Sequence, residues 1–144
     1  MDLALEEAGH AAGRGEVPVG AVIVAPDREV LARAGNRTIE YSDPTAHAEI
    51  LAIREACRIA GRERLEDCDL YVTLEPCAMC ATAISFARIR RLYFGAGDEK
   101  MGGVEHGPRI YAQPTCHHAP DVYGGISERR AVELLQDFFK ERRG

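Results

Sequence analysis

Hydrophobic and polar positions along the chain change between helical and strand-like periods. Residues 3–12 carry apolar side chains at helical spacing and predict a short helix. Residues 17–25 form a nearly continuous apolar run, which is typical of a strand covered on both faces. After the turn signal Pro26-Asp27, residues 29–34 predict a second strand that forms a hairpin with the first. The chain therefore opens as helix, strand, strand.

Two helices are predicted in the middle of the chain, each opened by a proline. Asp43 suits the N-cap of the first and Pro44 its first helical position. Apolar residues then recur at spacings of 4, 3, 4 and 3 up to Gly61, a typical helix stop. A short buried strand at residues 70–74 separates this helix from the second, predicted over residues 76–87. The pattern in this region is helix, strand, helix.

The last third of the chain is less regular. Residues 91–94 predict a strand that ends at Gly95. Residues 98–125 are rich in Gly, Pro and His and show no clear period. A loop this long inside a compact domain is usually functional or contains a short element of its own. Ser127 caps a final helix whose apolar face predicts core packing. That face is formed by Ala131, Leu134, Leu135, Phe138 and Phe139.

Length and composition fit one globular domain. We predict a single α/β domain over residues 1–144, with helices on both faces of one mixed sheet. No run of about 18 apolar residues exists, and residues 1–7 lack the basic and apolar segments of a secretory signal. These features predict a cytoplasmic protein without a membrane span. The net charge of -5 is not the basic footprint of a nucleic-acid binder, although basic residues group at 88–91 and 140–143.

A split cluster of metal-binding side chains carries the candidate chemistry. His47 and Glu49 lie near one predicted helix start, and Cys77 and Cys80 near the next. Catalytic zinc sites use three nitrogen, sulfur or oxygen ligands and leave a fourth position for water. We predict that His47, Cys77 and Cys80 bind Zn²⁺, and that Glu49 is the catalytic proton carrier. The predicted reaction is hydrolytic loss of an exocyclic amine from an amidine-type carbon, as ammonia. A helix N-terminus favours the thiolate form of Cys77.

Other interpretations of the cysteines and histidines remain open. A closed structural zinc site needs a fourth ligand, from Cys57, Cys68, Cys116 or another histidine. A Cys-x-x-Cys pair also occurs in redox proteins, although the histidine and glutamate weaken that interpretation. The run Cys116-His117-His118 suggests either a second metal site or a loop that frames the pocket or a dimer edge, and the loop is favoured.

The cluster His47-Ala48-Glu49 with Pro76-Cys77 and Cys80 resembles the zinc signature of the cytidine deaminase superfamily. Longer blocks resemble bacterial tRNA-specific adenosine deaminases, and together they span almost the whole chain. These blocks are residues 16–22, 35–37, 43–49, 70–77, 88–91 and 137–143.

The resemblance implies a cytidine-deaminase-like fold: a three-layer α/β/α sandwich around a central mixed five-stranded sheet. It also implies one Zn²⁺ per subunit, a homodimer, and conversion of the wobble adenosine of an arginine tRNA to inosine. A base in an anticodon loop is easily taken out of its stack. Asn36 would hydrogen-bond that base. Without the resemblance, a turn residue after Gly35 is the alternative interpretation. In the basic tail, mainly Arg142 and Arg143 would contact the anticodon stem-loop.

Three classes of function compete at this point. The first is a tRNA adenosine deaminase. The second is a free-base or nucleoside deaminase that acts on guanine or cytosine with the same zinc site. The third is a non-catalytic zinc module. The acidic net charge favours a small substrate, whereas Asn36 and the tail favour tRNA, which is our hypothesis.

Overall fold

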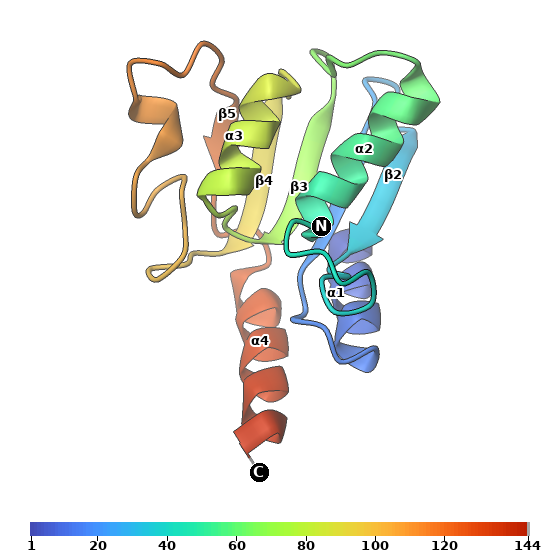
Figure 1. Ribbon diagram of the computed structural model, residues 1–144, viewed down its shortest axis with the longest axis vertical. Coiled ribbons are helices and arrows are strands. Elements are labelled where there is room, and N and C mark those ends of the chain that lie inside the picture. The colour runs from blue at the N-terminus through green and yellow to red at the C-terminus, as the bar shows by residue number, and fades with distance from the viewer. Residues whose placement is uncertain (144) are drawn as a thin grey trace.

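The computed structural model describes the backbone of residues 1–143 and the side chains of residues 1–142. Helices and strands alternate along it, as Figure 1 shows. In chain order the elements are α1 (Asp2–Gly13), β1 (Gly20–Val24), β2 (Val30–Gly35), α2 (Ala48–Ala60), β3 (Asp69–Leu74), α3 (Ala78–Phe86), β4 (Arg91–Ala96), the 3₁₀ helix η1 (Ile110–Ala112), β5 (Asp121–Tyr123) and α4 (Glu128–Arg143).

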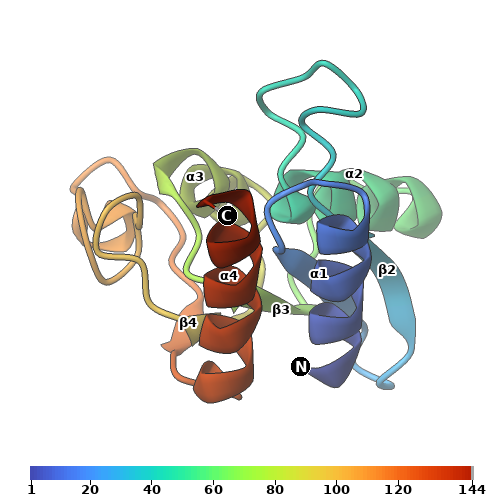
Figure 2. The ribbon, with the colours of Figure 1, turned by 90° about the horizontal axis from the view of Figure 1, so that it is seen from below.

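The strands form one mixed sheet of five strands in the order β2-β1-β3-β4-β5. β1 is antiparallel to both β2 and β3, whereas β3 pairs with β4, and β4 with β5, in parallel. Helices α2 and α3 cover one face of the sheet, and α1 and α4 cover the other (Figure 2). The predicted three-layer α/β/α sandwich with a mixed five-stranded sheet is confirmed.

Three strand ends meet at one edge of this sheet. Because β2 and β3 are both antiparallel to β1, and β4 is parallel to β3, these three strands run in the same direction. Asn36, Glu75 and Gly97 follow directly after their last residues. Ligands of α/β proteins commonly bind outside the carboxyl ends of the strands. The topology therefore brings three distant segments to the edge where a site is expected.

Apolar packing fixes both helical layers. On one face of the sheet, α1 lies very close to β1, because Gly20 has no side chain there. A Cβ at Gly20 would lie 2.6 Å from the Ala8 nitrogen and would overlap the Ala4 carbonyl oxygen. The larger core lies between the sheet and α2–α3. Its fully buried members include Ile23, Leu70, Val72, Ile84 and Leu92.

The helix predicted to open at Asp43 and Pro44 begins later, at Ala48, so that prediction is wrong. The side chain of Asp43 is used in a local turn, where its Oδ1 accepts the Thr45 N–H at 2.8 Å and the Thr45 hydroxyl at 2.7 Å. Such an Asx turn competes with helix N-capping. The N-cap of α2 is His47.

The helix predicted from residue 76 also begins later, because Pro76 is not its first helical residue. The N-cap of α3 is Cys77, and the helix starts at Ala78. The Pro76 carbonyl oxygen accepts the Gly103 N–H at 2.8 Å, which ties this turn to a distant loop. Two residues predicted to bind metal are therefore N-caps. By contrast, Gly61 ends α2 as predicted, in the left-handed conformation at φ 68°.

The irregular segment 98–125 contains η1 and β5, so the expectation of a short element within it is confirmed. β5 has three residues and pairs with β4 alone, which is too little to produce an alternating pattern in the sequence.

Helix α4 packs on the sheet through its first half and extends beyond the sheet edge (Figure 1). Ala131 and Phe138 are buried, whereas Phe139 is exposed. Neither α4 nor any other helix within residues 1–143 is long and apolar enough to cross a membrane.

Candidate metal centre and cleft

The three predicted metal ligands meet between the starts of α2 and α3. Their ligand atoms all lie within 4.8 Å of one another. His47 Nδ1 is 3.6 Å from the Cys77 Sγ and 3.5 Å from the Cys80 Sγ. His47 and Cys77 are extended N-cap residues, yet neither side chain caps its own helix. Both side chains are therefore left to face the shared site.

These distances fit a tetrahedral zinc ion. Bonds of about 2.3 Å to sulfur and about 2.0–2.1 Å to nitrogen, at the tetrahedral angle, separate the two ligand atoms by about 3.5 Å. The observed nitrogen–sulfur distances of 3.5 and 3.6 Å match that separation. Within residues 1–142 no fourth His, Cys, Asp or Glu joins the cluster. The donor set therefore fits one Zn²⁺ per subunit with one coordination position free of protein.

Hydrogen bonding within the cluster prepares a thiolate. The Cys80 thiol donates to Cys77, and this bond, opposed by burial and aided by His47, lowers the pKa of Cys77 to about 4. The same bond and burial raise the pKa of Cys80. The hydrogen bond to Cys77 also raises the pKa of His47. The site thus favours the thiolate form at Cys77, and thiolate is the form of cysteine that binds a metal.

Glu49 lies beside the metal ligands without being one of them. It occupies the first turn of α2 with 3% of its surface exposed, and it lines the cleft next to His47 and Cys77. Burial, reinforced by the negative charge of Cys77, raises the pKa of Glu49 to about 7. Residues two apart do not face each other along a helix. His47 and Glu49 share one site because His47 precedes the helix and its side chain lies across the helix end.

The cluster lies in a cleft with a volume of about 760 Å³. The cleft is bordered by segments that follow β2, β3 and β4, and by the second half of α4. Its lining includes Val17, Val19, Asn36, Thr38, His47, Glu49, Leu74, Glu75, Cys77, residues 97–101, Leu135 and Phe139. A hollow of about 750 Å³ also lies near the opposite edge of the sheet, beside Asp69 and Arg91. The two hollows are similar in volume, so the metal-binding side chains and Glu49, rather than size, distinguish the cleft from the other hollow.

Asn36 lines the cleft beside the metal ligands, and hydrogen bonds to its neighbours fix its position. Its side-chain Oδ1 accepts the Ala48 N–H at 2.8 Å and so caps the start of α2. Its backbone N–H donates to the Val19 carbonyl, and its carbonyl accepts the Arg14 guanidinium at 3.1 Å. With Oδ1 engaged, the amide NH₂ group is the part that remains for a ligand in the cleft. Asn36 thus lines the cleft and caps α2, and its hydrogen bond to a base stays a prediction.

One wall of the cleft follows Asn36 and is held from inside by Glu16. Glu16 is 1% exposed, and its carboxylate accepts the N–H groups of Ile39 at 3.2 Å and Glu40 at 2.9 Å. It also accepts the hydroxyl of Thr38 at 3.3 Å. Although burial acts to raise it, these hydrogen bonds lower the pKa of Glu16. The buried carboxylate therefore stays ionised and stabilises the loop.

We expect the Glu16→Gln variant to unfold more easily, by about 1–3 kcal/mol at pH 7, because one amide cannot accept every donor. A lowered folded pKa contributes stability above the unfolded pKa of about 4.3, and this contribution is lost as pH falls through the folded pKa. The difference between wild type and variant should therefore shrink below about pH 4. Urea titrations at several pH values measure it. A difference independent of pH would show that the charge of Glu16 has no part in stability.

The basic tail is only partly free. The Arg142 guanidinium lies 4.2 Å from the centre of the Phe138 ring and donates to the Gly15 carbonyl at 3.0 Å. Phe139 faces the cleft and is 42% exposed. The Arg143 backbone belongs to α4, but its side chain lies outside the described residues. The end of α4 thus borders the cleft, and Arg142 also packs against the protein itself.

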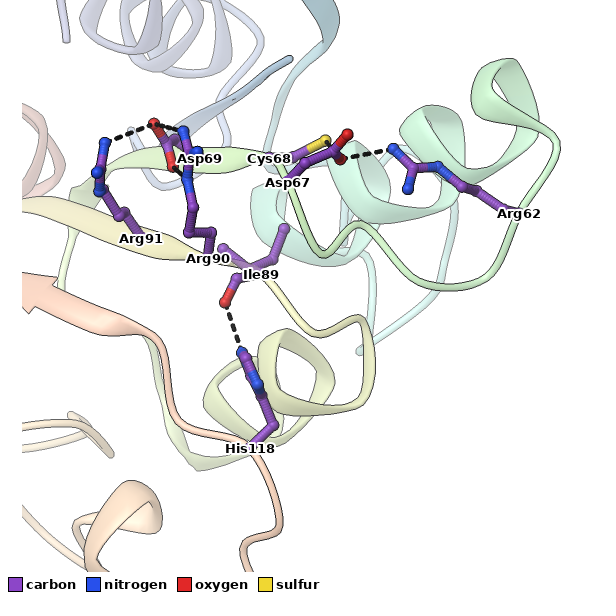
Figure 3. A network of polar contacts seen from close by, with 8 residues as sticks. All are labelled: Arg62, Asp67, Cys68, Asp69, Ile89, Arg90, Arg91 and His118. Atoms are coloured by element: carbon purple, nitrogen blue, oxygen red, sulfur yellow. Dashed lines mark hydrogen bonds and ion pairs between the residues drawn. The ribbon is translucent and has the colours of Figure 1, made fainter. Parts of the chain in front are cut away.

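The other cysteines and the late histidines bond elsewhere. The Cys57 thiol donates to a backbone carbonyl at 3.7 Å, and the Cys68 thiol to a carboxylate at 3.4 Å. The Cys116 thiol donates to the His118 carbonyl at 3.1 Å, and the His118 ring donates to the Ile89 carbonyl at 2.7 Å (Figure 3). Among the described side chains, none of these groups forms a second cluster of metal ligands. The loop interpretation of residues 116–118 fits this packing.

Several lining residues escaped the sequence analysis. Thr38 and Leu135 line the cleft, as do residues 97–101, which follow β4. For residues 98–101 the only available signal was the irregular composition of residues 98–125, and it located no particular contact. Leu135 was predicted only as part of an apolar helix face. Glu75 belongs to residues 70–77, one of the blocks that carry the family resemblance, but nothing in the pattern assigned it a role.

Comparison with known proteins is consistent with this site. The family model for the cytidine and deoxycytidylate deaminase zinc-binding region matches residues 1–96. A tRNA-specific adenosine deaminase from Agrobacterium fabrum is 63% identical over 99% of the chain and 93% of the relative. One from Rickettsia bellii is 48% identical over 99% of both. A solved structure from a study of A-to-I editing by tRNA:A34 deaminases has a TM-score of 0.92 at 64% identity, covering 94% of this chain and 97% of that one.

Proposed function

We propose a function from the family of this chain, which belongs to the tRNA-specific adenosine deaminases of the cytidine and deoxycytidylate deaminase family. The proposed reaction converts the wobble adenosine in the anticodon of an arginine tRNA to inosine. The reaction consumes one water and releases one ammonia. The observation that carries the proposal is the cluster of His47, Cys77 and Cys80 beside the buried carboxylate of Glu49, at the base of an open cleft.

His47, Cys77 and Cys80 would hold the metal. When bound, zinc supplies a Lewis acid that makes water nucleophilic near neutral pH. The protein side chains fix where the reaction takes place, because two helix N-termini and their extended N-caps converge on one point. The adenine would enter the cleft with C6 toward this point.

Glu49 would move the protons. Its carboxylate accepts a proton from the attacking water and delivers protons to the ring nitrogen N1 and to the departing amine. The oxygen of water bonds to C6, and the bond from C6 to the amine breaks, so that adenosine and water give inosine and ammonia. The cleft shields the carboxylate from bulk solvent, which keeps the transferred proton between these partners.

Asn36 would orient the base. Its Oδ1 is held by the Ala48 N–H, and its NH₂ group therefore has a fixed direction from which to donate to an acceptor on the purine edge. Phe139 and Leu135 add apolar surface on the α4 side of the cleft, where an unstacked base or its neighbour can pack.

The remaining partners follow from the same proposal. The protein would act in the cytoplasm on the anticodon stem-loop. It would be a homodimer, because α3 exposes the apolar side chains of Phe86, 77% exposed, and Met79, 36% exposed. Sedimentation equilibrium measures the mass, and a monomer at assay concentrations would refute the dimer.

The experiment that tests the proposal compares two classes of substrate. We expect inosine at the wobble position after incubation with an anticodon stem-loop of arginine tRNA, and no ammonia from free guanine or cytosine. Ammonia from a free base without inosine in the RNA would instead support the free-base deaminase. Nucleoside analysis of the digested RNA and an ammonia assay give both answers.

The charge of the tail gives a separate prediction. Replacing Arg142 and Arg143 together with alanine should weaken binding of the stem-loop and reduce the slope of log affinity against log salt by about 1–2, if both contact phosphate. Arg129→Ala is a matched control, because that exposed arginine is on the same helix about 20 Å away. Filter binding between low and physiological salt measures both quantities. Unchanged affinity and slope would leave the tail with a structural role only.

A further inference from the structure

Glu75 is a buried carboxylate that the chemistry described above does not use. It follows β3 directly and is 2% exposed. Its Oε1 accepts the Asp98 N–H at 3.0 Å and lies 2.6 Å from the His106 Nδ1. Its Oε2 accepts the N–H groups of Val104 at 3.1 Å, Glu105 at 2.9 Å and His106 at 3.1 Å. One side chain thus holds both ends of residues 98–106.

The segment that Glu75 holds forms a wall of the cleft. Residues 97–101 line the cleft opposite the segment that follows Asn36. The segment lies between β4 and η1, outside the named helices and strands, and an isolated β-bridge pairs its Gly102 with Cys77. Within it, Asp98 Oδ1 accepts the N–H groups of Lys100 and Met101, at 3.1 and 3.0 Å, and closes the turn. The shape of this wall therefore depends on a carboxylate behind it.

The surroundings of Glu75 are built for the ionised form. Burial of a carboxylate is costly unless hydrogen bonds replace water. Here four backbone N–H groups and the His106 ring surround the two carboxylate oxygens of Glu75. Space is also reserved for the carboxylate, because a Cβ on Gly102 would lie 2.5 Å from Oε2.

We propose that Glu75 is a positioning residue for the deaminase, which acts by holding residues 98–106 in place as the substrate wall of the cleft. The proposal rests on the proposed function, since the wall is taken to contact the RNA. It differs from support of the metal ligand Cys77. The carboxylate bonds to the wall. The wall in turn meets the ligand turn through the Gly103 N–H to the Pro76 carbonyl and through a β-bridge between Gly102 and Cys77.

The Glu75→Gln variant tests the proposal. Its side-chain amide has nearly the shape of the carboxylate, but the amide NH₂ group would face backbone N–H donors of residues 98–106 in place of an acceptor. We expect the variant to keep one zinc per subunit. Its KM for the anticodon stem-loop should rise about tenfold, which is about 1.4 kcal/mol, with a smaller change in kcat. Backbone amides of residues 98–106 should exchange with deuterium faster than in wild type, while the rest of the sheet keeps its protection.

Asp69→Asn is the matched control. The Asp69 carboxylate pairs with Arg90 at 3.1 Å and Arg91 at 3.9 Å (Figure 3). Asp69 begins the strand that Glu75 follows, so it lies at the end of β3 away from the cleft. This variant loses a carboxylate that pairs with arginines and not with the loop, so it should leave KM and the exchange of residues 98–106 unchanged. An equal rise in KM would mean that general destabilisation, rather than the wall, explains the effect.

If Glu75→Gln does not fold, His106→Ala tests the same contact, because it removes one of the donors from the partly exposed side. It should give a smaller rise in KM and faster exchange of residues 98–106. Unchanged exchange, or loss of zinc with a fall in kcat, would overturn the proposal. Wild-type protein that forms no inosine would refute the proposed function instead, and the exchange measurement would still decide the role of Glu75.

Discussion

Glu49→Gln should lose deaminase activity by about 10²–10⁴-fold in kcat while it retains one zinc per subunit. The amide has nearly the shape of the carboxylate, but it cannot accept the proton of water or deliver protons to the base. The three metal ligands are untouched, since Glu49 lies outside the ligand set. Single-turnover formation of inosine at saturating enzyme measures the chemical step, and metal analysis of the same sample measures zinc.

Glu55→Gln controls for a lost carboxylate on the same helix. The Glu55 side chain is 44% exposed and pairs with Arg58, a surface contact that contributes little, so activity should be unchanged. Full activity of Glu49→Gln or Glu49→Ala with zinc retained would refute the proton-transfer role. Loss of zinc together with activity would make Glu49 part of the metal site rather than a catalytic group.

Removal of zinc should abolish activity and lower the Tm. A ligand that binds only the folded state stabilises it by about 4 kcal/mol when its free concentration is 1,000 times Kd. Two thiols and an imidazole at ligand spacing favour zinc over hard cations. Added Zn²⁺ should therefore restore both properties, whereas Mg²⁺ should not. Calorimetry and the inosine assay, before and after chelation, give the measurements.

Cysteine variants separate the cluster from the remaining thiols. Cys80→Ser should lose zinc and activity. Cys116→Ser should keep both, because that thiol bonds to a backbone carbonyl outside the cluster. Full activity after complete removal of zinc would contradict the assignment of a metal-dependent reaction.

The metal cluster was predictable because its spacing is local to two helix starts. His47 with Glu49, and Cys77 with Cys80, are each within one turn in sequence, and the chemistry of those residue types limits what they bind. The layered fold was predictable from alternating periods for the same reason. Each apolar period reports on a single element.

The exact helix starts were not predictable from proline and aspartate alone. Asp43 has two uses for its side chain, a helix cap or a turn, and the turn through Thr45 prevails. The outcome places His47 at the N-cap, which is why it shares a site with Glu49. The rule that places aspartate at the N-cap and proline at the first helical position was therefore wrong at the start of α2, where His47 is the N-cap.

The walls of the cleft were not predictable because their contacts are distant in sequence and have no period. The partners of Glu75 are 23–31 residues further along the chain. Those of Glu16 are 22–24 residues away, in a turn-like segment. The strand β5 was hidden for a related reason, since three residues are too few to show alternation. These side chains and their backbone partners come together only in the folded chain.

The most direct test of the account follows the oxygen of water. When wild-type protein reacts with the anticodon stem-loop of arginine tRNA in H₂¹⁸O, mass spectrometry should find inosine at the wobble position with one ¹⁸O atom, and one ammonia should be released per inosine. Glu49→Gln should form neither product at a comparable rate. Inosine without the label, or labelled product from free guanine or cytosine with unmodified RNA, would contradict hydrolytic deamination of tRNA at this site.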